Sequence, residues 1–121
     1  MKRYNKVFWI FVIVMSLIIL YGSLVRPENV PGAEAVGGTG ILHFASYLVL
    51  SFFYFNALEQ RKAVYSASFA VSYGIFMEFL QLFTGYRTFS LADISINAAG
   101  AVIAVALMLG VKYGSEKLAE R

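Results

Sequence analysis

The sequence has no cysteine, only two prolines, one histidine and little charge. Without cysteine, disulfides, zinc–thiolate sites and cysteine nucleophiles are excluded. Charged residues make up 14% of the 121 residues and hydrophobic residues 60%, whereas roughly a quarter of a typical soluble domain is charged. The mean hydropathy is +0.70. A chain of this size could not hide so much apolar surface from water, so we expect neither a soluble domain nor a disordered chain but a membrane protein.

Four long stretches are almost free of charge. They cover residues 7–25, 41–58, 63–83 and 92–111. Each is long enough for an α-helix to cross a hydrocarbon layer about 30 Å thick. We therefore predict an all-α fold in which four transmembrane helices pack as a bundle, within one domain over residues 1–121. The first stretch exceeds the length of a signal-peptide core, so we expect it to be retained as a helix.

Short polar segments separate these stretches. Residues 26–40 hold both prolines and four of the ten glycines, which predicts a loop. Residues 59–62 predict a tight turn, and residues 84–91 a compact loop.

Lysine and arginine are distributed unequally between the two ends of the predicted bundle. Only Arg26 and Arg87 belong to one end. The other eight belong to the end with the chain termini: Lys2, Arg3, Lys6, Arg61, Lys62, Lys112, Lys117 and Arg121. Because segments rich in Lys and Arg stay in the cytoplasm, we predict a multi-pass protein with both termini cytoplasmic. The net charge of +3 then reflects membrane topology, and we predict no nucleic-acid partner.

Several polar side chains lie in or beside the predicted helices, where they are costly and often functional. In this topology they share one depth, near the outer loops. We predict that they form an outward-facing polar pocket of His43, Tyr47, Glu78, Gln81, Arg87, Asp93 and Asn97. Small residues share the helix faces of Glu78 and Asn97: Ser66, Ala70 and Gly74 on one helix, Gly100, Ala101 and Ala104 on the next. Such stripes let helices approach closely, so both faces should point inward.

These polar residues also have structural explanations. Ser90 and Asp93 form S-x-x-D before an apolar run, a pattern typical of a helix cap. Arg87 could pair with Glu78 or Asp93, and Asn97 could bridge helices. A buried hydrogen-bond network is therefore an alternative to a ligand site.

Three kinds of chemistry are open to the predicted pocket. The guanidinium of Arg87 could bind the phosphate of an anionic head group. His43 and Glu78 could act as acid–base groups of an enzyme, although no nucleophile motif accompanies them. His43, Glu78 and Asp93 are metal-ligating types without a metal-binding spacing, so we predict neither a metal nor another cofactor. We favour a binding protein over an enzyme.

The stretch from Gly74 to Gly100 resembles the VanZ-like membrane proteins. Their pattern runs G-x3-E-x2-Q, then R, then D-x3-N-x2-G, and this chain has all seven residues. The segment from His43 to Tyr47 resembles the family's earlier H-x3-Y element. This resemblance covers nearly the whole chain and implies a small multi-helix protein of the cell envelope.

The resemblance also implies a low-level role in resistance to the glycopeptide antibiotic teicoplanin. In the favoured hypothesis the partners are membrane lipids together with a lipid-linked cell-wall precursor or a glycopeptide. A membrane-embedded enzyme acting on a lipid phosphate or ester, and a structural membrane subunit, are the alternatives. Thr39 and Gly40 stand where many relatives carry Asp-Lys, which removes one cation from any anion site.

Overall fold

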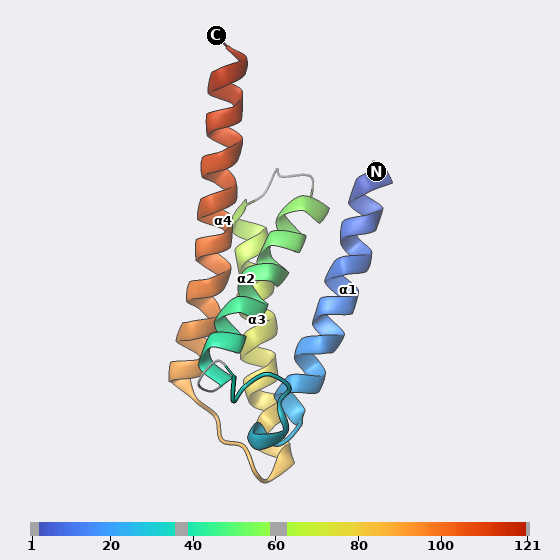
Figure 1. Cartoon of the computed structure of the whole chain (residues 1–121), viewed down its shortest axis with the longest axis vertical. Helices are drawn as coiled ribbons and strands as arrows, with labels where there is room; N and C mark the ends of the chain where they lie inside the picture. Colours follow the sequence, from blue (N-terminus) through green and yellow to red (C-terminus); the bar gives the residue numbers. More distant parts are fainter. Residues whose placement is uncertain (1–2, 36–38, 59–62, 121) are drawn as a thin grey trace.

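Four long helices make up most of the protein (Figure 1). The structure is a computed structural model, and it describes residues 3–35, 39–58 and 63–120. Its elements are α1 (Arg3–Leu24), η1 (Pro27–Asn29), α2 (Thr39–Ala57), α3 (Ala63–Gln81), η2 (Leu82–Thr84) and α4 (Leu91–Ala119). These described ranges contain no strand, and all four α-helices are long and apolar enough to cross a membrane. The prediction of an all-α fold with four transmembrane helices is confirmed.

The last helix is longer than the predicted membrane span. α4 continues past residue 111 to Ala119, and in Figure 1 its red end stands clear of the other helices. A helix of 29 residues rises about 43 Å, more than a hydrocarbon layer of about 30 Å. The turn predicted at residues 59–62 lies outside the described residues.

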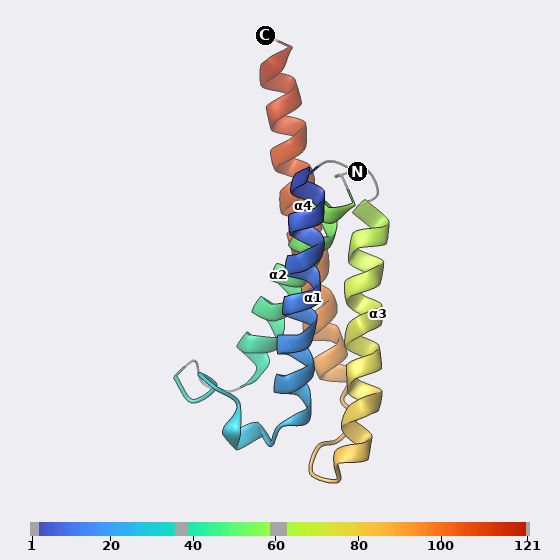
Figure 2. The ribbon, with the colours of Figure 1, turned by 90° about the vertical axis from the view of Figure 1, so that its right-hand side faces the viewer.

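The helices run alternately up and down, so the start of α1 and the end of α4 lie at the same end of the bundle (Figures 1 and 2). Residues 25–35 and 82–90 lie at the opposite end, which we call the loop end. α2 packs most extensively on α4 and also contacts α1 and α3. α3 contacts all of the other three helices, so α2 and α3 form the centre of the bundle.

Small and polar side chains face the interior of the bundle. The buried residues of α3 are Ser66, Ala70, Gly74, Met77, Glu78 and Gln81. Those of α4 are Asn97, Gly100, Ala101, Ala104 and Val105. Both inward-facing stripes are therefore confirmed. Large apolar side chains such as Leu17, Phe76 and Leu107 are more than half exposed on the outside, as expected where helices meet lipid rather than water.

Gly100 sets the distance between α4 and α2. A Cβ atom at this position would lie 2.4 Å from the carbonyl oxygen of Phe44 and 3.2 Å from the backbone nitrogen of Leu48. These are backbone atoms, so a larger side chain would have to push the two helices apart. Gly110, further along the same helix, has no such neighbour within 4 Å.

We predict that Gly100→Ala destabilises the bundle by about 1–3 kcal/mol through overpacking. Gly110→Ala should leave stability unchanged or raise it, by up to about 1 kcal/mol, because alanine is the better helix former. Thermal unfolding in detergent compares the two variants. Equal stabilities would contradict the close approach of α4 to α2.

Candidate functional site

Side chains from α3 and the loop after it cap the C-terminal end of α1. The amide nitrogen Nε2 of Gln81 donates to the carbonyl oxygen of Ser23 at 3.1 Å. The guanidinium of Arg87 donates through Nε to Val25 and through Nη2 to Gly22, both at 3.0 Å. The end of α1 is thus held by residues that lie far from it in the sequence.

Tyr86 completes this cap by donating from its hydroxyl to the carbonyl oxygen of Leu24. A helix leaves its last four carbonyl groups without partners inside the helix, and a bilayer offers little water to replace them. Here each carbonyl from Gly22 to Val25 receives a side-chain donor. Arg87 also places a positive charge at the negative end of the helix dipole.

The electrostatic surroundings of Arg87 fit this role. Partial burial lowers the pKa of the guanidinium, and the nearby carboxylates of Asp93 and Glu78 act in the opposite direction. Because the ordinary pKa of an arginine guanidinium lies far above neutral pH, the side chain remains a charged donor.

Glu78 performs the corresponding task at the N-terminal end of α4. Its Oε2 atom accepts a hydrogen bond from the backbone nitrogen of Ser90 at 3.0 Å. The hydroxyl oxygen of Ser90 in turn accepts from the backbone nitrogen of Asp93 at 3.1 Å, which confirms the predicted helix cap. A carboxylate is favourable at this position because the N-terminal end of a helix carries partial positive charge.

Tyr47 and Asn97 both pack against Gly74 in the interior. A Cβ atom on Gly74 would approach Tyr47 Cε1 to 3.2 Å and Asn97 Nδ2 to 3.3 Å. Tyr47 is 0% exposed and Asn97 2%. Neither the Tyr47 hydroxyl nor Asn97 Oδ1 has a hydrogen-bond partner among the described residues. These two atoms are candidates for contact with a ligand, because buried polar groups normally have partners.

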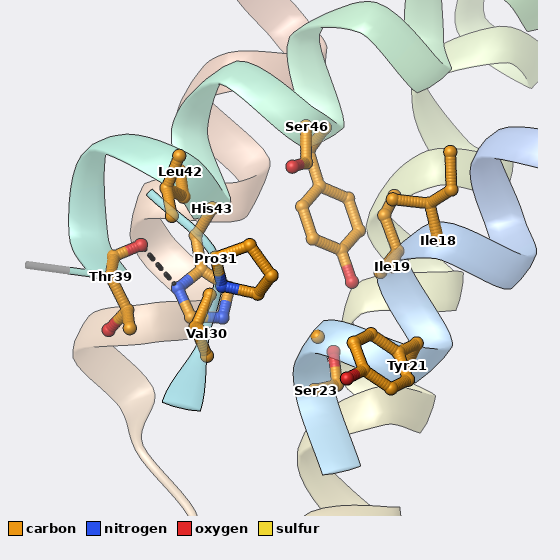
Figure 3. Close-up of a pocket in the computed structure, with 12 residues that line it drawn as sticks. Ile18, Ile19, Tyr21, Ser23, Val30, Pro31, Thr39, Leu42, His43 and Ser46 are labelled. Atoms are coloured by element: carbon orange, nitrogen blue, oxygen red, sulfur yellow. Dashed lines mark hydrogen bonds between the residues drawn. The ribbon is translucent and has the colours of Figure 1, made fainter. Parts of the chain in front are cut away.

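A cavity of about 220 Å³ lies beside Tyr47, between α1, α2 and residues 30 and 31, which follow α1 (Figure 3). Its lining consists of Ile18, Ile19, Tyr21, Gly22, Ser23, Val30, Pro31, Thr39, Leu42, His43, Ser46 and Tyr47. The ring nitrogen Nδ1 of His43 lies 2.8 Å from the carbonyl oxygen of Thr39, the contact dashed in Figure 3. None of the described residues that line this cavity is Asp, Glu, Lys or Arg.

The structure divides the predicted polar pocket into two groups. His43 and Tyr47 line the cavity. Glu78, Gln81 and Arg87 cap helix ends, Asp93 lies in the first turn of α4, where its backbone nitrogen is capped by Ser90, and Asn97 lies in the core. No cluster of three His, Asp or Glu residues that could hold a metal occurs in the ranges 3–35, 39–58 and 63–120.

Several polar residues of the cavity were not among the predicted pocket residues. Thr39 and Ser46 lie four residues before and three residues after His43, so helical spacing alone could have placed them on its face. Tyr21 and Ser23 lie on another helix, and no sequence spacing relates them to His43.

Comparison with known proteins identifies a family. A family model described as VanZ/LLP1 matches residues 6–112. No curated protein and no solved structure matches the chain.

We predict that Arg87→Ala lowers the free energy of unfolding by about 1.5–3 kcal/mol, because it removes charge-assisted hydrogen bonds from two carbonyl groups of α1. Arg26→Ala is the matched control. Arg26 is exposed at the same loop end and stacks on the Tyr86 ring at 4.7 Å, so its loss should cost less than about 1 kcal/mol. Thermal unfolding in detergent checks this order, and its reversal would contradict the capping role of Arg87.

Proposed function

The chain belongs to the VanZ/LLP1 family. We propose that this multi-pass membrane protein binds a lipid-borne ligand in the cavity between α1 and α2. One observation carries the proposal. The hydroxyl of Tyr47 is buried and lacks a partner among the described residues, and Tyr47 lines a cavity of about 220 Å³. Such a hydroxyl gains a hydrogen bond when a ligand with a polar group occupies the cavity.

The charged residues favour this cavity over the full polar pocket. The donors of Arg87 are directed to the carbonyl groups of Gly22 and Val25, and Glu78 accepts from Ser90. A phosphate bound by Arg87 would compete with the end of α1. A binding role is therefore better supported at the uncharged cavity.

The same contacts argue for binding rather than acid–base catalysis. His43 bonds the carbonyl oxygen of Thr39, and Glu78 bonds Ser90. Glu78 does not line the cavity. A pair of acid–base groups would need both side chains within reach of one substrate.

The exposed residues at the rim of the cavity suggest that the ligand enters from the bilayer. Tyr21 and Ile18 both line the cavity, yet they are 62% and 55% exposed. Their exposed parts lie on the outer surface of a helix that is apolar enough to cross the membrane. We propose that the ligand is a membrane lipid or a lipid-linked cell-wall precursor, and that screening such a precursor supports low-level resistance to glycopeptides of the teicoplanin type.

We predict that Ser46→Phe, which fills the cavity, abolishes retention of lipid. Ala45→Phe is the control, because Ala45 is exposed on α2 and does not line the cavity. Native mass spectrometry should find lipid on the wild-type protein and on Ala45→Phe, but not on Ser46→Phe. The teicoplanin concentration that inhibits growth should be lower for cells that carry Ser46→Phe than for cells that carry the wild type or Ala45→Phe. Equal retention by the two variants, or none by the wild type, would refute the binding site.

We also propose that the cavity opens at the outer side of the membrane, with both chain termini in the cytoplasm. Lys6, Lys112 and Lys117 belong to the helix ends opposite the loop end, which supports this orientation. Since the native chain has no cysteine, a single introduced thiol reports its own position. A membrane-impermeant maleimide should label Ala35→Cys in intact cells and Ser115→Cys only after permeabilisation. The opposite pattern would reverse the orientation.

A further inference from the structure

The cavity is built for an uncharged group. Its walls are mostly apolar, from Ile18, Ile19, Val30, Pro31 and Leu42, and no lysine or arginine lines it. An anion in such surroundings would lose its hydration without gaining a cation. Of the two arginines at the loop end, Arg87 bonds the end of α1 and Arg26 stacks on Tyr86.

Two polar groups of the cavity can bond a ligand. Nε2 of His43 is an acceptor, and the hydroxyl of Tyr47 can both donate and accept. A carbonyl oxygen can only accept, so in its contact with Thr39 the ring of His43 donates from Nδ1. In a neutral imidazole with its proton on Nδ1, the other nitrogen, Nε2, is an acceptor. Tyr47 lies one helical turn further along the same face of α2, and its hydroxyl has no partner among the described residues.

We propose that the cavity takes an uncharged, hydroxyl-bearing end of a lipid rather than its phosphate. A hydroxyl can donate to Nε2 of His43 and accept from the hydroxyl of Tyr47, whereas an ether can only accept and a phosphate adds charge. This inference rests on the proposed binding function and names the chemical group that is recognised.

The size of the cavity agrees with this assignment. At about 30 Å³ for each water-sized group, the 220 Å³ space holds roughly seven such groups. A hydroxyl and the first carbons of a chain fit, and the remaining chain leaves past the exposed rim at Ile18 and Tyr21. In a lipid-linked precursor, the phosphate would stay outside the cavity.

The test uses three probes that share one alkyl chain: 1-dodecanol, dodecyl methyl ether and dodecyl phosphate. Binding to the full-length protein is measured in lauryldimethylamine N-oxide, a detergent without hydroxyl groups. The wild type should bind the alcohol about tenfold more tightly than the ether, because the ether cannot donate the hydrogen bond to Nε2 of His43. It should also bind the alcohol more tightly than the phosphate.

Tyr47→Phe separates ligand contact from a structural role. This variant should bind the alcohol and the ether several-fold more weakly than the wild type does, because both probes accept a hydrogen bond from the Tyr47 hydroxyl. Without probe, its thermal midpoint should equal or exceed that of the wild type, because the hydroxyl gives up no bond among the described residues. Tyr73→Phe is the control. Its hydroxyl donates to the carbonyl oxygen of Ser16 at 2.5 Å, so this variant should lower the midpoint and leave the binding of the alcohol unchanged.

The outcomes distinguish the hydroxyl assignment from the proposed lipid binding. Equal binding of alcohol and ether, or tighter binding of the phosphate, would overturn the hydroxyl assignment and leave lipid binding in place. A lower midpoint for Tyr47→Phe with unchanged binding of the alcohol would also overturn it. If none of the three probes binds, the proposed function itself fails.

Discussion

The unpaired backbone groups at the helix ends are the constraint on which the loop end of this protein depends. In a bilayer, carbonyl groups at a helix terminus need donors that water does not readily supply. Gln81, Tyr86 and Arg87 supply them for α1. At the N-terminal end of α4, Glu78 accepts a hydrogen bond from the backbone nitrogen of Ser90. These bonds tie α1 to α3 and the loop after it, and thereby hold in place one wall of the cavity beside α2.

Much of the fold follows from local properties of the sequence. The absence of charge over stretches such as 7–25 reveals the spans, because the bilayer imposes a minimum helix length. The four-residue spacing of Ser66, Ala70 and Gly74 indicates an inward helix face, because only small residues let two helices approach closely. The length of α4 was less predictable. Its polar C-terminal end stands clear of the other helices, so no packing within the bundle determines where it stops.

The candidate site was harder to predict, since sequence patterns relate side chains to one another and say little about backbone partners. Arg87 and Glu78 suggested an ion pair or a ligand, yet their closest contacts are carbonyl and amide groups of α1 and Ser90. The cavity depends on how residues 30 and 31 fold against α2. That arrangement belongs to a loop without periodicity, so only His43 and Tyr47 of its lining were identified as candidates.

The central claim is that charge holds the helix ends while an uncharged cavity holds the ligand. An experimental structure of the wild-type protein in a bilayer of its native lipids tests this most directly. Our account predicts density for a lipid in the cavity, in contact with the Tyr47 hydroxyl, and an Arg87 guanidinium that still bonds the carbonyl groups of Gly22 and Val25. Lipid density on the Arg87 guanidinium, with those carbonyl groups released and the cavity empty, would contradict it.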